Sequence, residues 1–257
     1  MIDDFLNYSA RLTESLSARG EVVGLVFVGS AAETDRVDEW SDHDFFVITK
    51  SGFAESLRND LSWLPDSASI AIVPRETEHG LKVVYEAGHV LEFAVFNDEE
   101  LELAAVNSFA VAFDKTDITD RIEAIAERSV PKPFDAKTEF ELFLATMLIG
   151  VGRARRGETL IAGQQIRSYC MRHALGLIRQ WVPVAAGTQN SGDSLDRFRR
   201  FEFQYPEIAL QLEALQQAEV EASAKGLLHL VLELGEAALT EAQLHQVYVV
   251  RNRLGWR

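Results

Sequence analysis

Two aspartates separated by one residue stand where an apolar segment begins, because Asp42-His43-Asp44 leads directly into Phe45–Thr49. In a β-strand the side chains of residues i and i+2 lie on the same face, so Asp42 and Asp44 are expected to point together and His43 away. Neighbouring carboxylates repel each other unless a cation lies between them. The spacing therefore predicts a site for a hard divalent cation such as Mg²⁺, which prefers oxygen ligands and often shares them with phosphates.

A glycine and a serine precede this pair. The apolar run Val22–Val28 ends on Gly29-Ser30, and residues 31–41 separate them from Asp42. Glycine lets a backbone approach a phosphate closely, and a helical turn starting at Ser30 would direct free N–H groups at an anion. Gly29 and Ser30 are therefore predicted to contact the phosphates of a nucleotide. The alternative is a Gly-Ser turn followed by a solvated acidic loop.

Residues 27–49 resemble the signature of the nucleotidyltransferase superfamily that includes DNA polymerase beta: an apolar strand, Gly-Ser, a gap, and Asp-x-Asp on the next strand. The stretch 28–46 looks like the motif stretch of the lincosamide and aminoglycoside nucleotidyltransferases, and Trp40-Ser41 before Asp42 resembles the aromatic residue and serine found there in the lincosamide group. His89–Phe93 resembles the later strand that carries a third carboxylate, here Glu92. The resemblance covers most of the chain in layout, and its specific part is the 29–44 motif.

The resemblance implies two Mg²⁺ ions held by Asp42 and Asp44, and ATP or another nucleoside triphosphate as co-substrate. It implies attack of a substrate hydroxyl on the α-phosphate, with pyrophosphate leaving. Glu92 would be the general base or a further metal ligand; otherwise it is a solvated strand residue. Arg156, with Arg153 and Arg167, is a candidate for contact with the triphosphate, although helices also carry arginine for solubility.

Length and charge limit the function classes. The 257 residues suffice for one large or two medium domains, and no run approaches the ~18 apolar residues of a membrane span. The net charge of −15 disfavours a nucleic-acid partner and favours a small cationic, hydroxylated substrate. The acidic N-terminus is unlike a secretory signal, which predicts a cytoplasmic protein. Whether the chain forms a homodimer stays open.

The charge is unevenly distributed along the chain, and the cysteine and histidine content bears on disulfides and zinc. Residues 1–135 hold 27 Asp/Glu and 11 Lys/Arg, a net of 11 − 27 = −16, whereas residues 153–200 hold nine Arg and three acids, a net of +6. An acidic, metal-binding half and an arginine-rich segment would suit a triphosphate. Cys170 is the only cysteine, and the six histidines show no His-Glu-x-x-His spacing, so we predict neither a disulfide nor a zinc site.

Apolar periodicity predicts an α+β fold, with a mixed β-sheet and flanking helices over residues 1–130 and an all-α helical bundle over 134–257. The resemblance implies that the first is the nucleotidyltransferase catalytic domain and that the second binds the substrate. The proline-rich segment 129–134 is the expected linker. Helices are expected at 2–19, 53–64, 98–106 and 119–128, and strands at 22–28, 45–49, 69–74, 81–86, 89–96 and 109–113.

In the second half, helices are expected from 140, at 160–181, after a cap at Asp193-Ser194, and at 206–218, 220–239 and 240–253, with a loop at 183–193. The helix at 160–181 should bury one stripe, which includes Ile166, Tyr169, Cys170, His173, Leu177 and Trp181.

Three functions compete at this stage. The first is a nucleotidyltransferase that acts on a small molecule, including antibiotics of the aminoglycoside or lincosamide type. The second is a nucleotidyltransferase with a protein or nucleic-acid acceptor, as in toxin–antitoxin systems. The third is a catalytically silent nucleotide-binding protein.

Overall fold

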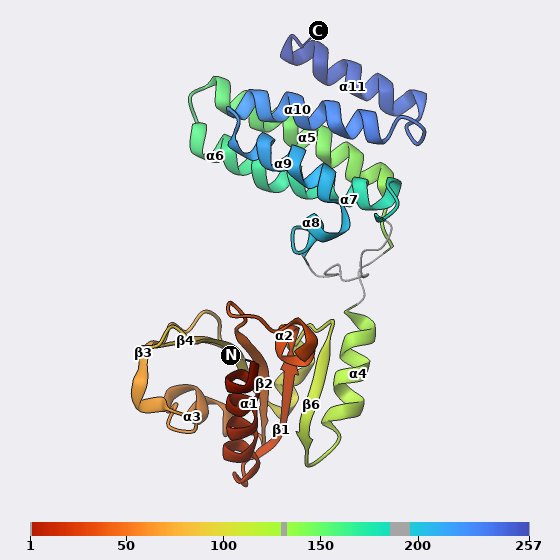
Figure 1. Ribbon diagram of the computed structural model, residues 1–257. Helices are drawn as coiled ribbons and strands as arrows, with labels where there is room; N and C mark the ends of the chain where they lie inside the picture. The colour runs from red at the N-terminus through yellow and green to blue at the C-terminus, as the bar shows by residue number, and fades with distance from the viewer. Residues whose placement is uncertain (1, 130–132, 186–195, 257) are drawn as a thin grey trace. The chain divides into compact units, whose positions relative to one another are not determined.

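The chain divides into two compact units, a sheet unit (Met1–Val130) and a helical unit (Pro131–Arg257), each with its own core (Figure 1). This computed structural model describes residues 2–129, 133–185 and 196–256. Residues 130–132 of the predicted linker at 129–134 lie outside the described residues. In the described part of the chain, every helix falls short of the length or the apolar content that a bilayer crossing requires.

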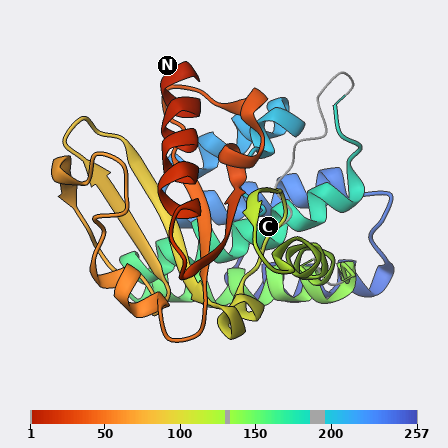
Figure 2. The same ribbon diagram turned by 90° about the horizontal axis from the view of Figure 1, so that it is seen from below.

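Six strands form one mixed sheet in the order β3-β4-β5-β2-β1-β6. The pair β2 and β5 is parallel, and every other neighbouring pair is antiparallel. In two views, β3 and β4 lie at one edge of this sheet (Figures 1 and 2). The predicted α+β class is confirmed. The strands are β1 Val22–Val28, β2 His43–Thr49, β3 Ile70–Ile72, β4 Gly80–Tyr85, β5 Val90–Asn97 and β6 Phe109–Asp114.

The strand register brings distant parts of the chain together at one end of β2. Asp44 lies opposite Glu92 of β5 on one side and opposite Val28, the last residue of β1, on the other. The parallel pairing needs the long connection between Thr49 and Val90, which crosses the sheet and returns through β3 and β4.

Helices cover both faces of the sheet. On one face, α1 (Ile2–Ser17) packs Phe5, Tyr8, Leu12 and Leu16 against the inner residues of β1, β2 and β5. On the other face, α4 (Ile118–Arg128) packs through an apolar stripe of Ile118, Ile122 and Ile125. The remaining short elements are α2 Gly29–Ala32, α3 Ala54–Asn59 and the 3₁₀ turns Thr34–Arg36, Ser67–Ser69 and Asp98–Leu103.

Two helices predicted in the sheet unit differ from the structure. The helix predicted at 53–64 ends at Asn59, and the chain continues in turns that bury Trp63, whose indole N–H donates to the carbonyl of Leu57 at 2.9 Å. The apolar spacing over 53–64 that predicted one helix therefore comes from a short helix followed by a buried turn. Residues 98–103 form a 3₁₀ helix, closed by a capping box between Asn97 and Glu100.

The helical unit contains no strand among its described residues, as predicted. Its elements are α5 Ala136–Arg155, α6 Thr159–Gln164, a π-helical segment η4 Gln165–Cys170, α7 Met171–Trp181, α8 Phe201–Gln204, α9 Pro206–Gln217, α10 Val220–Leu234 and α11 Glu241–Leu254. The helix predicted after Asp193-Ser194 is wrong over 196–200, where the chain forms turns; 186–195 lie outside the described residues.

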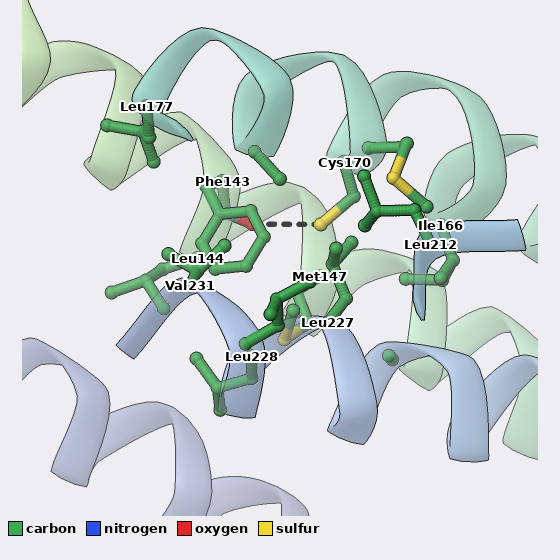
Figure 3. Packing of buried hydrophobic residues seen from close by; sticks show 14 of the residues in the cluster. Phe143, Leu144, Met147, Ile166, Cys170, Leu177, Leu212, Leu227, Leu228 and Val231 are labelled. Atoms are coloured by element: carbon green, nitrogen blue, oxygen red, sulfur yellow. Dashed lines mark hydrogen bonds between the residues drawn. The ribbon is translucent and has the colours of Figure 1, made fainter. Parts of the chain in front are cut away.

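The core of the helical unit is built by α5, η4, α7 and α10 (Figure 3). Cys170 is fully buried there and its thiol donates to the carbonyl of Phe143 at 3.5 Å. Burial raises the pKa of this thiol, which keeps it protonated and unreactive. Tyr169, predicted on the buried stripe, is 45% exposed, because the π-helical turn shifts the stripe by a residue.

Candidate metal-binding active site

Three carboxylates meet at the end of β2. Asp42 immediately precedes this strand, Asp44 lies on it and Glu92 lies on the adjacent β5. One oxygen from each of the three lies within 4.8 Å of the others. The parallel register explains the meeting, because Asp44 and Glu92 are direct partners and their side chains stand on the same face. The structure thus places the Glu92 carboxylate beside those of the two aspartates, one of the two positions that the sequence left open, and its catalytic role stays a prediction.

The donor set of this carboxylate cluster suits a hard divalent cation. All three ligands are carboxylate oxygens, which Mg²⁺ prefers, whereas a zinc site would draw on histidine or cysteine. Metal ions in two-metal sites lie about 3.5–4 Å apart, so a group of oxygens within 4.8 Å can hold one ion or bridge two with small side-chain movements. The residues present therefore fit the Mg²⁺ that the sequence motif implies.

A lysine borders the cluster. Lys82 is the partner of Glu92 across the β4–β5 ladder, and its Nζ lies 3.5 Å from the Glu92 carboxylate. The same ammonium group lies 3.0 Å from Glu76, and hydrogen bonding to Glu76 and the charge of Glu92 raise the pKa of Lys82. Because Lys82 is shared between two glutamates and half-exposed, it offsets only part of the cluster's negative charge.

Gly29 and Ser30 lie against the aspartates. Gly29 has φ of +57°, and a Cβ placed there would stand 2.7 Å from Asp44 Oδ2. Only a glycine permits this approach, so the backbone of Gly29 passes directly over the Asp44 carboxylate. The Ser30 hydroxyl donates to the backbone carbonyl of Asp42 at 3.3 Å and ties the β1–α2 corner to the start of β2. Contact with phosphates stays a prediction for both residues.

Behind the carboxylates, His43 points to the opposite face of the sheet, as predicted, and is fully buried. Its ring stacks on Phe5 at 3.6 Å, Nδ1 lies 2.8 Å from His89 Nε2, and Nε2 lies 3.0 Å from Ser9 Oγ. Burial, and then the charge of His89, lowers the pKa of His43 to about 3, so the ring is neutral. These contacts anchor the residue between the two aspartates.

The turn before Asp42 exposes a tryptophan. Asp38 accepts a hydrogen bond from the Trp40 N–H at 2.8 Å, and the Asp38 N–H donates to Ser41 Oγ at 2.9 Å. The turn is therefore fixed by its own side chains, while the Trp40 side chain remains 86% exposed. Trp40 entered the sequence analysis only as part of the resemblance, although a tryptophan in a polar segment beside the motif could have been predicted to be exposed.

The arginines predicted to meet a triphosphate are engaged within the helical unit. Arg156 pairs with Glu158 at 2.8 Å, and Arg153 pairs with the same carboxylate group at 3.3 Å. Arg167 donates to the carbonyl of Ala218 at 2.7 Å. Contact of Arg156 with a nucleotide stays a prediction.

No protein-family model and no curated protein matches the chain. Among solved structures it is similar to an aminoglycoside 6-adenyltransferase from Bacillus subtilis, with 13% identity and a TM-score of 0.36 over 96% of this chain and 90% of that one. It is also similar to a nucleotidyltransferase-like protein from Exiguobacterium sibiricum 255-15, with 13% identity and a TM-score of 0.34 over 97% and 88%.

A third similar structure is the CdnC:HORMA-deltaN complex from E. coli MS115-1, with 14% identity and a TM-score of 0.32 over 99% of this chain and 91% of that one. At these identities and TM-scores, no residue role is transferred to this chain, and its function is argued from the carboxylate cluster.

Proposed function

We propose that the protein is a metal-dependent nucleotidyltransferase that transfers a nucleoside monophosphate, AMP from ATP in the first instance, to a hydroxyl group of a small molecule. The observation that carries this proposal is the meeting of Asp42, Asp44 and Glu92 within 4.8 Å, directly beside the glycine corner at Gly29. Carboxylates this close together repel one another, and a divalent cation bound between them removes that repulsion.

Each residue has a defined task in this reaction. Asp42 and Asp44 would hold Mg²⁺, which when bound would offset charge on the attacking and leaving oxygens of an in-line displacement. Glu92 would accept the proton of the acceptor hydroxyl as its oxygen forms a bond to the α-phosphorus. The bond from that phosphorus to the β-phosphate oxygen breaks, and pyrophosphate leaves with the electron pair. Gly29 and Ser30 would position the phosphates.

The acceptor is proposed to be a small cation that carries hydroxyl groups, with antibiotics of the aminoglycoside or lincosamide type as candidates. The net charge of −15 supports this class, because a strongly acidic protein attracts cations and repels nucleic acids. A protein or nucleic-acid acceptor has no comparable feature in its favour.

The test is an assay of pyrophosphate release from each of the four ribonucleoside triphosphates, with Mg²⁺ or EDTA, across a panel of aminoglycosides, lincosamides and other hydroxylated amines. Mass spectrometry would identify the product as acceptor plus nucleoside monophosphate. Metal-dependent release that is lost in Asp44→Asn supports the proposal. Equal binding of Mn²⁺, a paramagnetic substitute for Mg²⁺, to wild type and Asp44→Asn would overturn it, because the cluster would then hold no metal.

A further inference from the structure

A cavity in the helical unit lies where α5 and α11 end. Its volume is about 500 Å³, within the range of small-molecule sites. The last turns of α5 with its C-cap, Arg156, line one part of it, and Arg253 and Leu254 of α11 line the other. Every described lining residue belongs to the helical unit, so the cavity is complete without the sheet unit.

The charge of this cavity is positive, although the chain as a whole is acidic. Its described lining holds no carboxylate and four arginines, Arg153, Arg155, Arg156 and Arg253. Two carboxylates pair with these arginines, Glu158 and Glu221, so the local net charge is 4 − 2 = +2. The C-terminal ends of α5 and α11 offset about half a charge each, which still leaves an excess of about one positive charge. The cavity therefore favours an anion.

Arg155 fixes the two helix ends to each other. Its Nε and Nη2 donate to Glu221 at 3.0 and 2.6 Å, and Nη2 also donates to the carbonyl of Leu254 at 2.6 Å. The hydrogen bonds from Arg155 hold the pKa of Glu221 at about 2 against the effect of burial, so this pair stays ionised at neutral pH. Arg155 is therefore part of the scaffold, and an anion would be bound mainly by the other three arginines.

Those three guanidinium groups have donors to spare. Arg153 and Arg156 share the single carboxylate of Glu158, at 3.3 and 2.8 Å, and the Nε of Arg153 is buried without an acceptor among the described residues. Arg253 makes no hydrogen bond or ion pair with any residue that the structure describes. Because a guanidinium group carries five N–H donors, these side chains can bind a phosphate and keep their present bonds.

The cavity also has an apolar side. Ile149 lines it and is half-exposed, and Leu148 and Leu254 line it beside the arginines. An apolar group bound with the anion would cover Ile149 and remove apolar surface from water, which inorganic phosphate cannot do. A phosphate monoester supplies both parts, since it carries about −1.5 to −2 charges at neutral pH and an organic group.

We propose that this cavity binds a small-molecule phosphate monoester, with the phosphate group on Arg156 and Arg253 and an apolar group over Ile149. The site goes beyond the proposed transfer reaction, because it needs neither Mg²⁺ nor the carboxylate cluster. The triphosphate of the reacting nucleotide is the competing ligand, and a phospholipid headgroup is a second source of the same chemistry.

The test measures binding of phenyl phosphate, inorganic phosphate and benzyl alcohol to the full chain by calorimetry, in EDTA, at neutral pH and low salt. Phenyl phosphate should bind, inorganic phosphate should bind more weakly, and benzyl alcohol should not bind. Arg253→Gln should weaken phenyl phosphate about tenfold, since it removes a hydrogen bond to a charged group. Arg156→Gln should give a similar loss. No binding of phenyl phosphate would overturn the site, and equal binding of inorganic phosphate would overturn the ester as its ligand.

The matched control is Arg251→Gln, because Arg251 lies on the same helix but is not among the residues that line the cavity. It should leave the affinity for phenyl phosphate unchanged. Equal losses in Arg251→Gln and Arg253→Gln would show a diffuse attraction of anions to this end of α11 and would overturn a defined site. Thermal unfolding checks that the variants fold, which is expected because Arg156 and Arg253 are exposed.

Two further measurements separate this site from the competing ligands. Asp44→Asn should keep full affinity for phenyl phosphate, and Arg253→Gln should keep full affinity for Mg²⁺–ATP. A matching loss of Mg²⁺–ATP affinity in Arg253→Gln would assign the cavity to the reacting nucleotide and overturn a separate site. The protein should not sediment with phosphatidylcholine vesicles that contain phosphatidic acid. Sedimentation of wild type but not of Arg253→Gln would assign the cavity to a lipid headgroup and overturn the small-molecule ligand.

Discussion

The sheet unit contains two charged clusters that differ in how their carboxylates are partnered. Around Arg58, which is 6% exposed, the guanidinium group donates to Glu100 at 2.6 Å, to Glu55 at 3.2 Å and to the carbonyl of Val95 at 2.9 Å. Around β2, three carboxylates converge and Lys82 lies 3.5 Å from one of them. The first cluster places two carboxylates around a buried guanidinium group, whereas the second brings one oxygen from each of three carboxylates within 4.8 Å of one another.

The difference separates a structural role from a functional one. In the Arg58 cluster, hydrogen bonds from Arg75 and then Arg58 lower the pKa of Glu55 to about 2, so every partner stays ionised at neutral pH. A buried pair of this kind stabilises the fold only while both members are present. Three carboxylates that converge on one point repel one another, and such a cluster is expected where a cation from solution completes the site.

The largest effect is expected at the β2 cluster. Asp44→Asn removes a proposed metal ligand, and metal ions supply several kcal/mol of charge stabilisation, so turnover should fall about 10³-fold or more. The free energy of unfolding measured in EDTA should stay the same or rise, because a repulsion is relieved. Added Mg²⁺ should stabilise wild type but not the variant in urea denaturation. Near-normal turnover in Asp44→Asn would contradict the assignment.

Glu92→Gln should reduce turnover by about 10²–10⁴-fold while changing Mg²⁺–ATP affinity much less, because a general base acts on the acceptor rather than on the nucleotide. Single-turnover kinetics and calorimetry measure the two quantities separately. An equal loss in nucleotide affinity would reassign Glu92 as a metal ligand. Full activity would show that it is a solvated strand residue placed beside the site by register alone.

Local patterns were sufficient for the strands and for the Asp42–Asp44 pair, because a period of two and a glycine corner are properties of neighbouring residues. The position of Glu92 depends on the parallel pairing of β2 with β5, which joins residues 48 positions apart (92 − 44). In the sequence, this pairing is indicated only by the alternation of apolar and polar residues along β5. The pattern predicted its face, and the register supplied its distance.

Two features could not be predicted from the sequence, and the physical reason differs between them. The Arg58 cluster joins four separate elements through one guanidinium group, and an arginine on a short helix reads as a surface residue until its burial is known. The π-helical turn before Cys170 depends on how α5 and α10 pack around it, so a uniform period of 3.6 predicted the wrong exposure for Tyr169.

Arg58→Met should lower the free energy of unfolding by about 3–5 kcal/mol, because it leaves the Glu100 carboxylate without its buried partner. Urea denaturation in EDTA measures the change. Arg75→Gln is the matched control: it breaks an exposed pair with the same Glu55 and should cost less than about 1 kcal/mol. A cost below about 1 kcal/mol for Arg58→Met would remove the contrast between the two clusters.

Acid should weaken the Arg58 cluster in a defined pH window. The pKa of Glu55 is held at about 2 in the folded protein against an ordinary value of 4.5, and that of Glu100 is also lowered, by the Asn97 N–H and Arg58 against the opposing effect of burial. Their stabilisation is complete above about pH 4.5 and is lost as the pH falls toward 2. The urea midpoint of wild type should therefore decline over this window more steeply than that of Arg58→Met.

The smallest effect is expected at Lys82, whose ammonium group offsets part of the negative charge of the β2 cluster. Its ammonium group competes with a metal ion for Glu92, yet it is 37% exposed and shared with Glu76, so the competition is weak. Lys82→Met should tighten binding of Mn²⁺ in the absence of nucleotide by up to about fivefold, since an exposed pair is worth at most about 1 kcal/mol. Paramagnetic resonance measures free Mn²⁺ directly, and Lys50→Met controls for the general loss of one positive charge.

Unchanged or weaker binding in Lys82→Met alone would show that Glu92 lies outside the metal's reach. The cluster would then bind metal through Asp42 and Asp44 only, and Glu92 would be left to the acceptor.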